Sequence, residues 1–166
     1  MNYGYITVAS AIPSVRVADA DYNIKQIESL IAQAEGKGAE IIVFPELSVT
    51  GYSCQDLFAQ QTLLDQTEMK ILQLLDFSRM LDIICIIGAP VCIGTALYNC
   101  AVVCQHGNIL GIVPKRYLPN YGEFYEKRWF ASADDLDCPI EVRFAGNTIT
   151  VSPDIQLFQT CDGVKF

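Results

Sequence analysis

The order of apolar runs and amphipathic stretches in the first 90 residues limits this chain to a sheet whose strands alternate with helices. Residues Tyr3–Ala9 alternate and are rich in tyrosine, isoleucine and valine, which indicates a strand. A helix is predicted to begin after an N-cap at Asp19 or Asp21 and to end at Gly36 and Gly38. Its apolar residues recur three and four positions apart: Ile24, Ile27, Ile31 and Ala34.

The same alternation continues through a second strand, a second helix and a third strand. The run Glu40–Phe44 is nearly all apolar, as expected for a strand covered on both faces, and Pro45 ends it. An apolar stripe predicts a helix over Thr62–Met80, and Ile83–Ala89 is predicted to be another buried strand.

The second half of the chain has the pattern of β-hairpins. Four strands are predicted, at Ala96–Gln105, Ile109–Pro114, Ile140–Phe144 and Thr148–Ser152. His-Gly-Asn and Ala-Gly-Asn turns separate the members of each pair, as is typical of hairpins. The sequence therefore predicts an α/β fold with helices on one face of a sheet, and it allows a second sheet on the other face.

Composition excludes several function classes. The length of 166 residues is typical of one domain, and with 51% hydrophobic and 18% charged residues the chain is expected to fold rather than be disordered. A net charge of −8 gives no general attraction for nucleic acid or anionic lipid. Without an 18-residue apolar run or a leader-like N-terminus, the sequence predicts no membrane segment and a cytoplasmic location.

The seven cysteines are predicted to be free thiols, because their number is odd and most lie inside apolar runs. Cys100 and Cys104 lie on one predicted strand, roughly 13 Å apart, which is too far for a disulfide. No CxxC pair occurs, and the only histidine, His106, lies in a predicted turn. We therefore predict no metal site and no Cys-His catalytic pair.

Glu46 is the first residue that could perform chemistry. It follows a buried strand by two residues, where open α/β sheets place their ligands and reactive groups. Apolar neighbours could desolvate its carboxylate and fit it to act as a general base. The alternative is a surface glutamate in a turn that Pro45 begins.

Lys115 is the second such residue, because it directly follows a predicted strand and opens a long loop without clear periodicity. This loop, from Lys115 to Asp137, carries six aromatic side chains among its charged residues. Aromatic walls with a few fixed charges suit a small polar ligand, and the lysine could stabilise an oxyanion. The composition fits a solvated loop or a subunit interface equally well.

These two segments resemble the motifs of the carbon-nitrogen hydrolase (nitrilase-like) superfamily. Residues 45–58, PELSVTGYSCQDLF, and residues 117–130, YLPNYGEFYEKRWF, resemble in particular the glutaminase domains of glutamine-dependent NAD synthetases. The resemblance covers essentially the whole chain. It implies a nitrilase-like α-β-β-α sandwich, incomplete at the C-terminal side, and amide hydrolysis by a Cys-Glu-Lys triad.

Carried over by motif, the resemblance assigns a role to five residues. Glu46 would be the general base and Lys115 the oxyanion stabiliser, while Glu123 would support the lysine. Tyr52 and Tyr121 would line the glutamine pocket.

The nucleophile of the family is not among the 166 residues. Its motif, close to Glu-Ile-Cys-Glu-Asp, is expected directly after a segment like Asp162–Phe166. Cys161 lacks those neighbours, and neither Cys54 nor Cys138 follows a buried strand. The sequence also holds no glycine-rich phosphate loop, so ATP, Mg²⁺ and the dinucleotide precursor are assigned to a synthetase domain that should follow.

We therefore interpret residues 1–166 as the N-terminal part of a glutaminase domain that releases ammonia for NAD synthesis and is inactive by itself. Unpaired edges and apolar surface favour a homo-oligomer. A free-standing amidase of the same superfamily and a non-catalytic interaction module are the alternatives.

Overall fold

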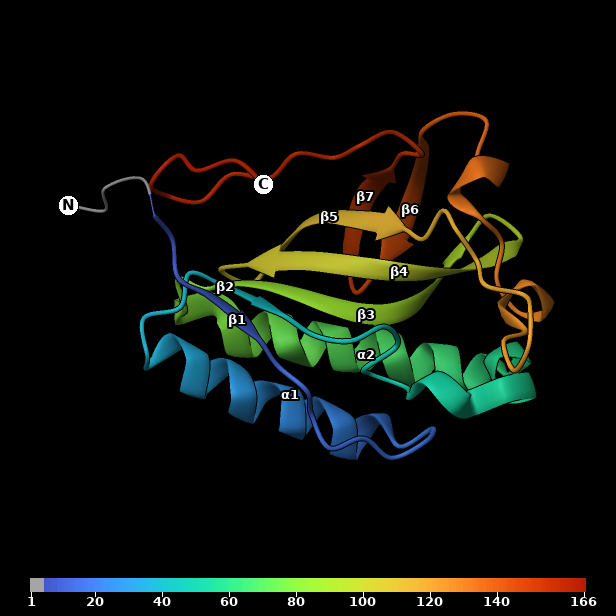
Figure 1. Ribbon diagram of the computed structural model, residues 1–166, viewed down its shortest axis with the longest axis horizontal. Helices are drawn as coiled ribbons and strands as arrows, with labels where there is room; N and C mark the ends of the chain where they lie inside the picture. Colours follow the sequence, from blue (N-terminus) through green and yellow to red (C-terminus); the bar gives the residue numbers. More distant parts are fainter. Residues whose placement is uncertain (1–4) are drawn as a thin grey trace.

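A computed structural model of the protein describes residues 5–166 and contains a five-stranded mixed sheet (Figure 1). The strand order follows the sequence: β1 (Val8–Ser10), β2 (Ile41–Val43), β3 (Ile84–Ile93), β4 (Ala96–Gln105) and β5 (Asn108–Pro114). Strands β1, β2 and β3 are parallel, and β4 is antiparallel to both of its neighbours. Strands β2 and β5 therefore end at the same edge of the sheet.

Two helices lie side by side on one face of this sheet (Figure 1). Helix α1 (Ala20–Glu35) begins after Asp19, whose carboxylate accepts a hydrogen bond from the backbone N–H of Tyr22, and Gly36 is its C-cap. Helix α2 (Gln61–Phe77) ends three residues earlier than predicted and continues as a short 3-10 turn, η2 (Ser78–Met80). Both predicted helices are confirmed, and of the two candidate N-caps, Asp19 and Asp21, Asp19 is the one that caps α1.

Side-chain alternation along the strands divides the core between the two faces of the sheet. On β4, Cys100 and Val102 face the helices and belong to the main core with Ile27 of α1 and Leu74 of α2. Residues of opposite parity, such as Asn99, face the other side.

The last two strands, β6 (Ile140–Phe144) and β7 (Asn147–Val151), form a separate antiparallel sheet. Their buried side chains join the main core on the helix side, and the N–H of Ala145 in the connecting turn donates to Glu68 of α2. This second sheet is therefore not the layer that the sequence allowed on the opposite face.

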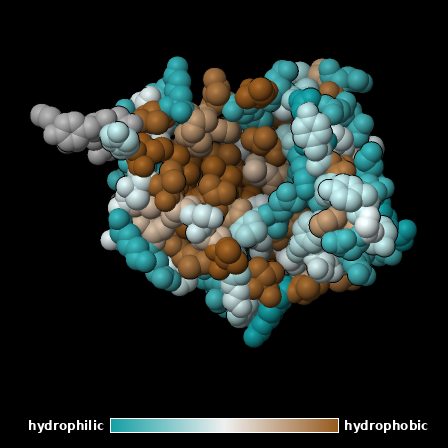
Figure 2. Space-filling view, viewed as in Figure 1, coloured by the Kyte–Doolittle hydropathy of each residue, from teal (hydrophilic) through white to brown (hydrophobic). Residues whose placement is uncertain are grey.

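The opposite face is covered only in part. Phe158 and Phe166, from the C-terminal segment, pack on Ile84 of β3 and Val103 of β4. Elsewhere this face carries exposed or half-buried apolar side chains, including Val43. In Figure 2 hydrophobic side chains gather over the part of the molecule that the strands occupy in Figure 1.

The remaining differences from the sequence predictions concern short segments. Part of the predicted strand Tyr3–Ala9 lies outside the described residues, and β1 begins only at Val8. The segment η1 (Tyr52–Ala59) is 3-10 helix that periodicity did not predict. The loop after β5 contains two further 3-10 turns, η3 (Glu126–Arg128) and η4 (Ala133–Asp135). No helix within residues 5–166 is long and apolar enough to span a bilayer.

Candidate active site

Glu46 reaches the centre of the sheet because the turn after β2 crosses over β3. Three strand spacings, roughly 14 Å, separate β2 from β5, so a residue at the end of β2 cannot meet one at the end of β5 unless the chain moves sideways. It does so over Gly88, where an added Cβ would lie 2.4 Å from the backbone N of Leu47 and 2.7 Å from the Cα of Glu46. The backbone N–H of Val49 donates to the carbonyl of Gly88 and holds the turn there.

Lys115 enters the same site from the end of β5. Its backbone N–H donates to the carbonyl of Asn99 at 2.8 Å, which continues the β4–β5 pairing by one residue. Its Nζ lies 2.8 Å from Oε2 of Glu46, although 69 residues separate the two in sequence. Glu46 and Lys115, each placed just after a strand, therefore converge on one site.

The second carboxylate on Lys115 belongs to Glu126, not to Glu123. Nζ of Lys115 lies 3.0 Å from both carboxylate oxygens of Glu126, which is only 2% exposed. Glu123 lies on the exposed part of the loop, three residues before Glu126, so the prediction that it supports the lysine is wrong in its position. The sequence places Glu123 and Glu126 in one loop without periodicity, so it does not show which of them meets the lysine. Only the burial of η3 in the structure distinguishes them.

Tyr52 belongs to this cluster. Its hydroxyl donates to Oε1 of Glu126 at 2.6 Å, so the buried carboxylate has partners on both sides. Burial, reinforced by this hydrogen bond, raises the pKa of Tyr52 above its ordinary value, which keeps the hydroxyl a donor. Whether Tyr52 contacts glutamine stays a prediction.

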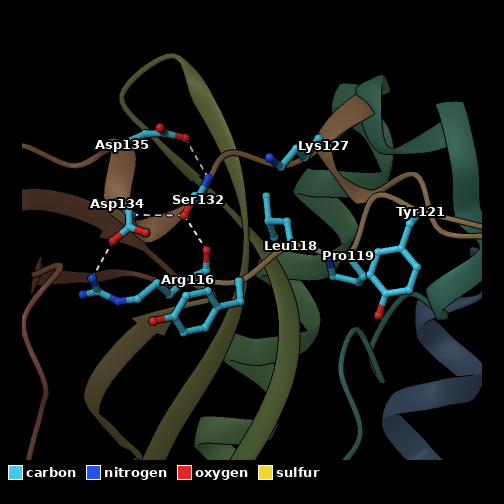
Figure 3. A pocket seen from close by; sticks show the side chains of 9 residues that line it. Arg116, Leu118, Pro119, Tyr121, Lys127, Ser132, Asp134 and Asp135 are labelled. Atoms are coloured by element: carbon cyan, nitrogen blue, oxygen red, sulfur yellow. Dashed lines mark hydrogen bonds and ion pairs between the residues drawn. The ribbon is translucent and has the colours of Figure 1, made fainter.

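Tyr121 lies in a different cavity, next to the site. This cavity, of about 650 Å³, is lined by residues of the loop after β5, and Tyr121 and Lys127 stand on one side of it, away from Asp134 and Asp135 (Figure 3). Tyr121 is 74% exposed and contacts Phe124 edge to face. Its role in a glutamine pocket also stays a prediction.

Asn99 is a site residue that sequence reasoning missed. Its Nδ2 donates to Oε2 of Glu46 at 3.0 Å, and Asn99 is 2% exposed. The available signal was a single asparagine within the apolar strand Ala96–Gln105, because a buried amide requires a hydrogen-bond partner.

A second set of contacts ties η1 to η3 and thereby supports Tyr52 and Glu126. Asp56 accepts two hydrogen bonds from the guanidinium of Arg128, at 2.8 and 3.1 Å, and one from the indole of Trp129 at 3.0 Å. These bonds lower the pKa of Asp56 to about 2. The two 3-10 segments are thus held together at neutral pH.

The electrostatics of the site keep Lys115 charged. Burial lowers the pKa of Lys115, but its hydrogen bonds to Glu46 and Glu126 outweigh this effect and raise the pKa above its ordinary value. The ion pairs contribute fully to stability below the unfolded pKa of about 10.4 and are lost as the pH rises through the higher folded value. The ammonium is therefore available to stabilise negative charge at neutral pH.

A cavity of about 270 Å³ lies against Glu46 and Lys115, with Val43, Ile86 and Val113 among its apolar walls. Cys100 is the only cysteine along it, and its side chain belongs to the helix-side core. All seven cysteines are free thiols. Within residues 5–166 no group of three or more His, Cys, Asp or Glu side chains is arranged to hold a metal ion. The site thus offers a carboxylate and an ammonium, with no thiol directed at them.

The mixed sheet with helices on one face makes this an α/β protein, and a carboxylate and a lysine meet at one edge of that sheet. Residues 7–162 match the family model of the carbon-nitrogen hydrolases. The chain belongs to the carbon-nitrogen hydrolase family, and its nitrilase-like α/β fold is confirmed.

Several relatives share a more specific description. The glutamine-dependent NAD(+) synthetase of Mycobacterium tuberculosis is 38% identical over 160 residues, which is 96% of this chain and 23% of that protein. The synthetase of Arabidopsis thaliana is 38% identical over 130 residues, covering 75% of this chain and 18% of the relative. The chain thus spans about a quarter or less of the length of these relatives.

Solved structures of other proteins share the fold of this chain. A glutamine-dependent NAD(+) synthetase from Cytophaga hutchinsonii superposes with a TM-score of 0.84 at 27% identity, covering 95% of this chain and 26% of that one. An amidase from Nesterenkonia, at 23% identity and a TM-score of 0.66, shares the fold.

Proposed function

We propose that this chain is the N-terminal part of the glutaminase domain of a glutamine-dependent NAD synthetase. The contact of Lys115 with Glu46 and Glu126 carries the proposal, because it brings together a base and an oxyanion-stabilising cation. The similarity to the synthetases of Mycobacterium tuberculosis and Arabidopsis thaliana favours this function over that of a free-standing amidase.

The chemistry follows from this arrangement. Glu46 accepts the proton of a cysteine thiol that lies outside residues 1–166, and the thiolate attacks the side-chain amide carbon of glutamine. The ammonium of Lys115 stabilises the tetrahedral oxyanion. When the C–N bond breaks, Glu46 returns the proton to the leaving nitrogen, and ammonia departs. Water, activated by the same carboxylate, then hydrolyses the thioester to glutamate and free thiol.

The other half of the proposed reaction uses groups that this chain does not supply. ATP and Mg²⁺ belong to a synthetase domain, which amidates nicotinic acid adenine dinucleotide with the released ammonia. The same proposal places the protein in the cytoplasm, which agrees with its free thiols.

The full-length protein is expected to form NAD with glutamine as nitrogen donor, whereas residues 1–166 alone are expected to release no ammonia from glutamine. The reason is that no thiol in the described chain is aimed at Glu46. Ammonia release and NAD formation measure the two activities.

Glu46→Gln in the full-length protein is expected to abolish the glutamine-dependent reaction and to spare the reaction supplied with ammonium salt. Glu123→Gln is the matched control, because this exposed glutamate lies outside the cluster. Glutamine hydrolysis by the 166-residue chain that disappears with Glu46→Gln would contradict the assignment of the nucleophile.

We also propose that residues 1–166 alone self-associate through the open face of the sheet. Val43 is 40% exposed there, beside the cavity at Glu46 and Lys115. Contiguous apolar surface of this kind promotes association. Val43→Glu is expected to shift the chain toward monomer in sedimentation and to reduce binding of a hydrophobic dye.

Leu72→Glu is the control for this prediction, because Leu72 is 51% exposed on α2. A compact wild-type monomer that binds no dye would contradict the proposed association.

A further inference from the structure

We propose that Asn99 is a positioning residue that fixes which oxygen of Glu46 accepts the proton. This inference rests on the proposed function, since it concerns the base of that reaction. The amide of Asn99 holds Oε2 of Glu46, so that Oε1 remains the proton acceptor.

The first observation is that the two carboxylate oxygens of Glu46 differ in their partners. Oε2 accepts hydrogen bonds from Nδ2 of Asn99 at 3.0 Å and from Nζ of Lys115 at 2.8 Å. Among residues 5–166, no side chain or backbone group donates a hydrogen bond to Oε1. A carboxylate bound through one oxygen presents the lone pairs of the other to a thiol.

The second observation is that Asn99 itself has little freedom. It lies within β4 opposite Pro90 of β3 and is 2% exposed. Its backbone carbonyl accepts the N–H of Lys115 at 2.8 Å. One residue therefore fixes the backbone of Lys115 through its carbonyl and the carboxylate of Glu46 through its amide.

The third observation separates Asn99 from Lys115, the other donor to Oε2. The flexible ammonium of Lys115 is shared between Glu46 and both oxygens of Glu126. This ammonium can follow the carboxylate of Glu46 as the carboxylate moves, and the proposed reaction also needs it to stabilise the oxyanion. Asn99 projects from a strand on a short side chain, so its amide provides a fixed reference for the orientation of Glu46.

The kinetic test uses Asn99→Leu and Asn99→Asp in the full-length protein. Both variants lack the donor, one with an apolar group and the other with a second carboxylate. We expect kcat for glutamine hydrolysis to fall about 100-fold, because a small misplacement of a catalytic group has effects of this size. We expect KM for glutamine to change less than about twofold, since uniform substrate binding is unaffected.

Controls separate positioning from folding and from substrate binding. Asn108→Asp removes an amide donor at the exposed first residue of β5 and is expected to leave kcat unchanged. Thermal unfolding of each full-length variant reports whether it is folded, and the ammonia-dependent reaction reports whether the synthetase activity is intact. A variant of Asn99 with unchanged kcat, whether or not its KM is raised, would overturn the proposal.

A second measurement does not depend on activity. In the 166-residue chain labelled with ¹⁵N, the side-chain amide signals of Asn99 are expected to shift when Glu46 is replaced by alanine. Unchanged signals would overturn the proposal even if the enzyme is active. A wild-type protein without glutaminase activity, but with the expected amide shift, would instead refute the proposed function and leave the contact with Asn99 established.

Discussion

Replacing Lys115 by methionine is expected to reduce glutamine hydrolysis by the full-length protein at least 100-fold, because removing one donor to a developing oxyanion lowers kcat by about this factor. The same change leaves Glu126 as a buried carboxylate without its cation. Removing one partner of a buried ion pair costs about 3 kcal/mol or more of folding free energy. For this chain that corresponds to a loss of about 6 to 12 °C in Tm.

Two measurements separate these effects of Lys115→Met. Thermal unfolding of the chain follows stability, and ammonia release from glutamine follows chemistry. The double variant Lys115→Met/Glu126→Gln is expected to recover at least half of the lost stability, because the buried charge is removed, and to recover none of the activity. A single variant as stable as the wild type would show that Glu126 does not depend on Lys115.

Gly88→Ala is expected to displace the turn that carries Glu46. The new Cβ would lie 2.4 Å from Pro45 O and Leu47 N, which are backbone atoms and cannot rotate away. Overpacking of this kind costs about 1 to 3 kcal/mol. Because the turn that must shift carries Glu46, we expect glutamine hydrolysis to fall about 100-fold.

The control for this prediction is Gly36→Ala at the end of α1. Gly36 has a helical φ of −61°, and an added Cβ would lie 3.3 Å from Ala32 O. We expect its effect on unfolding to stay below about 1 kcal/mol and its activity to equal that of the wild type. Equal activity of Gly88→Ala would show that the turn does not rely on this close approach.

The regular elements could be predicted because their signals are local. The stripe of isoleucines in α1 and the turns between paired strands each lie within one short window. The 3-10 segments η1 and η3 could not be predicted in this way. They are held by contacts between residues distant in sequence, such as Asp56 with Arg128 and Tyr52 with Glu126.

The site, like the fold, could be predicted only where its signals are local in sequence. Glu46 and Lys115 could be found because each follows a strand and belongs to a motif that resembles the carbon-nitrogen hydrolases. Glu126 could not be separated from Glu123, since the loop around them has no period that relates position to burial. The single asparagine at position 99 indicated a buried amide, but its partner could not be predicted because Glu46 lies 53 residues away in sequence.

The sequence by itself determined which segments form the two α-helices and the main strands, and that Glu46 and Lys115 stand at strand ends, because hydrophobic period and turn residues act over a few positions. Only the tertiary structure decided which carboxylate meets the lysine and which amide holds the base. Those contacts depend on the crossing of the Glu46 turn over Gly88 and on the burial of η3. Both result from packing between segments 40 or more residues apart, which no local pattern encodes.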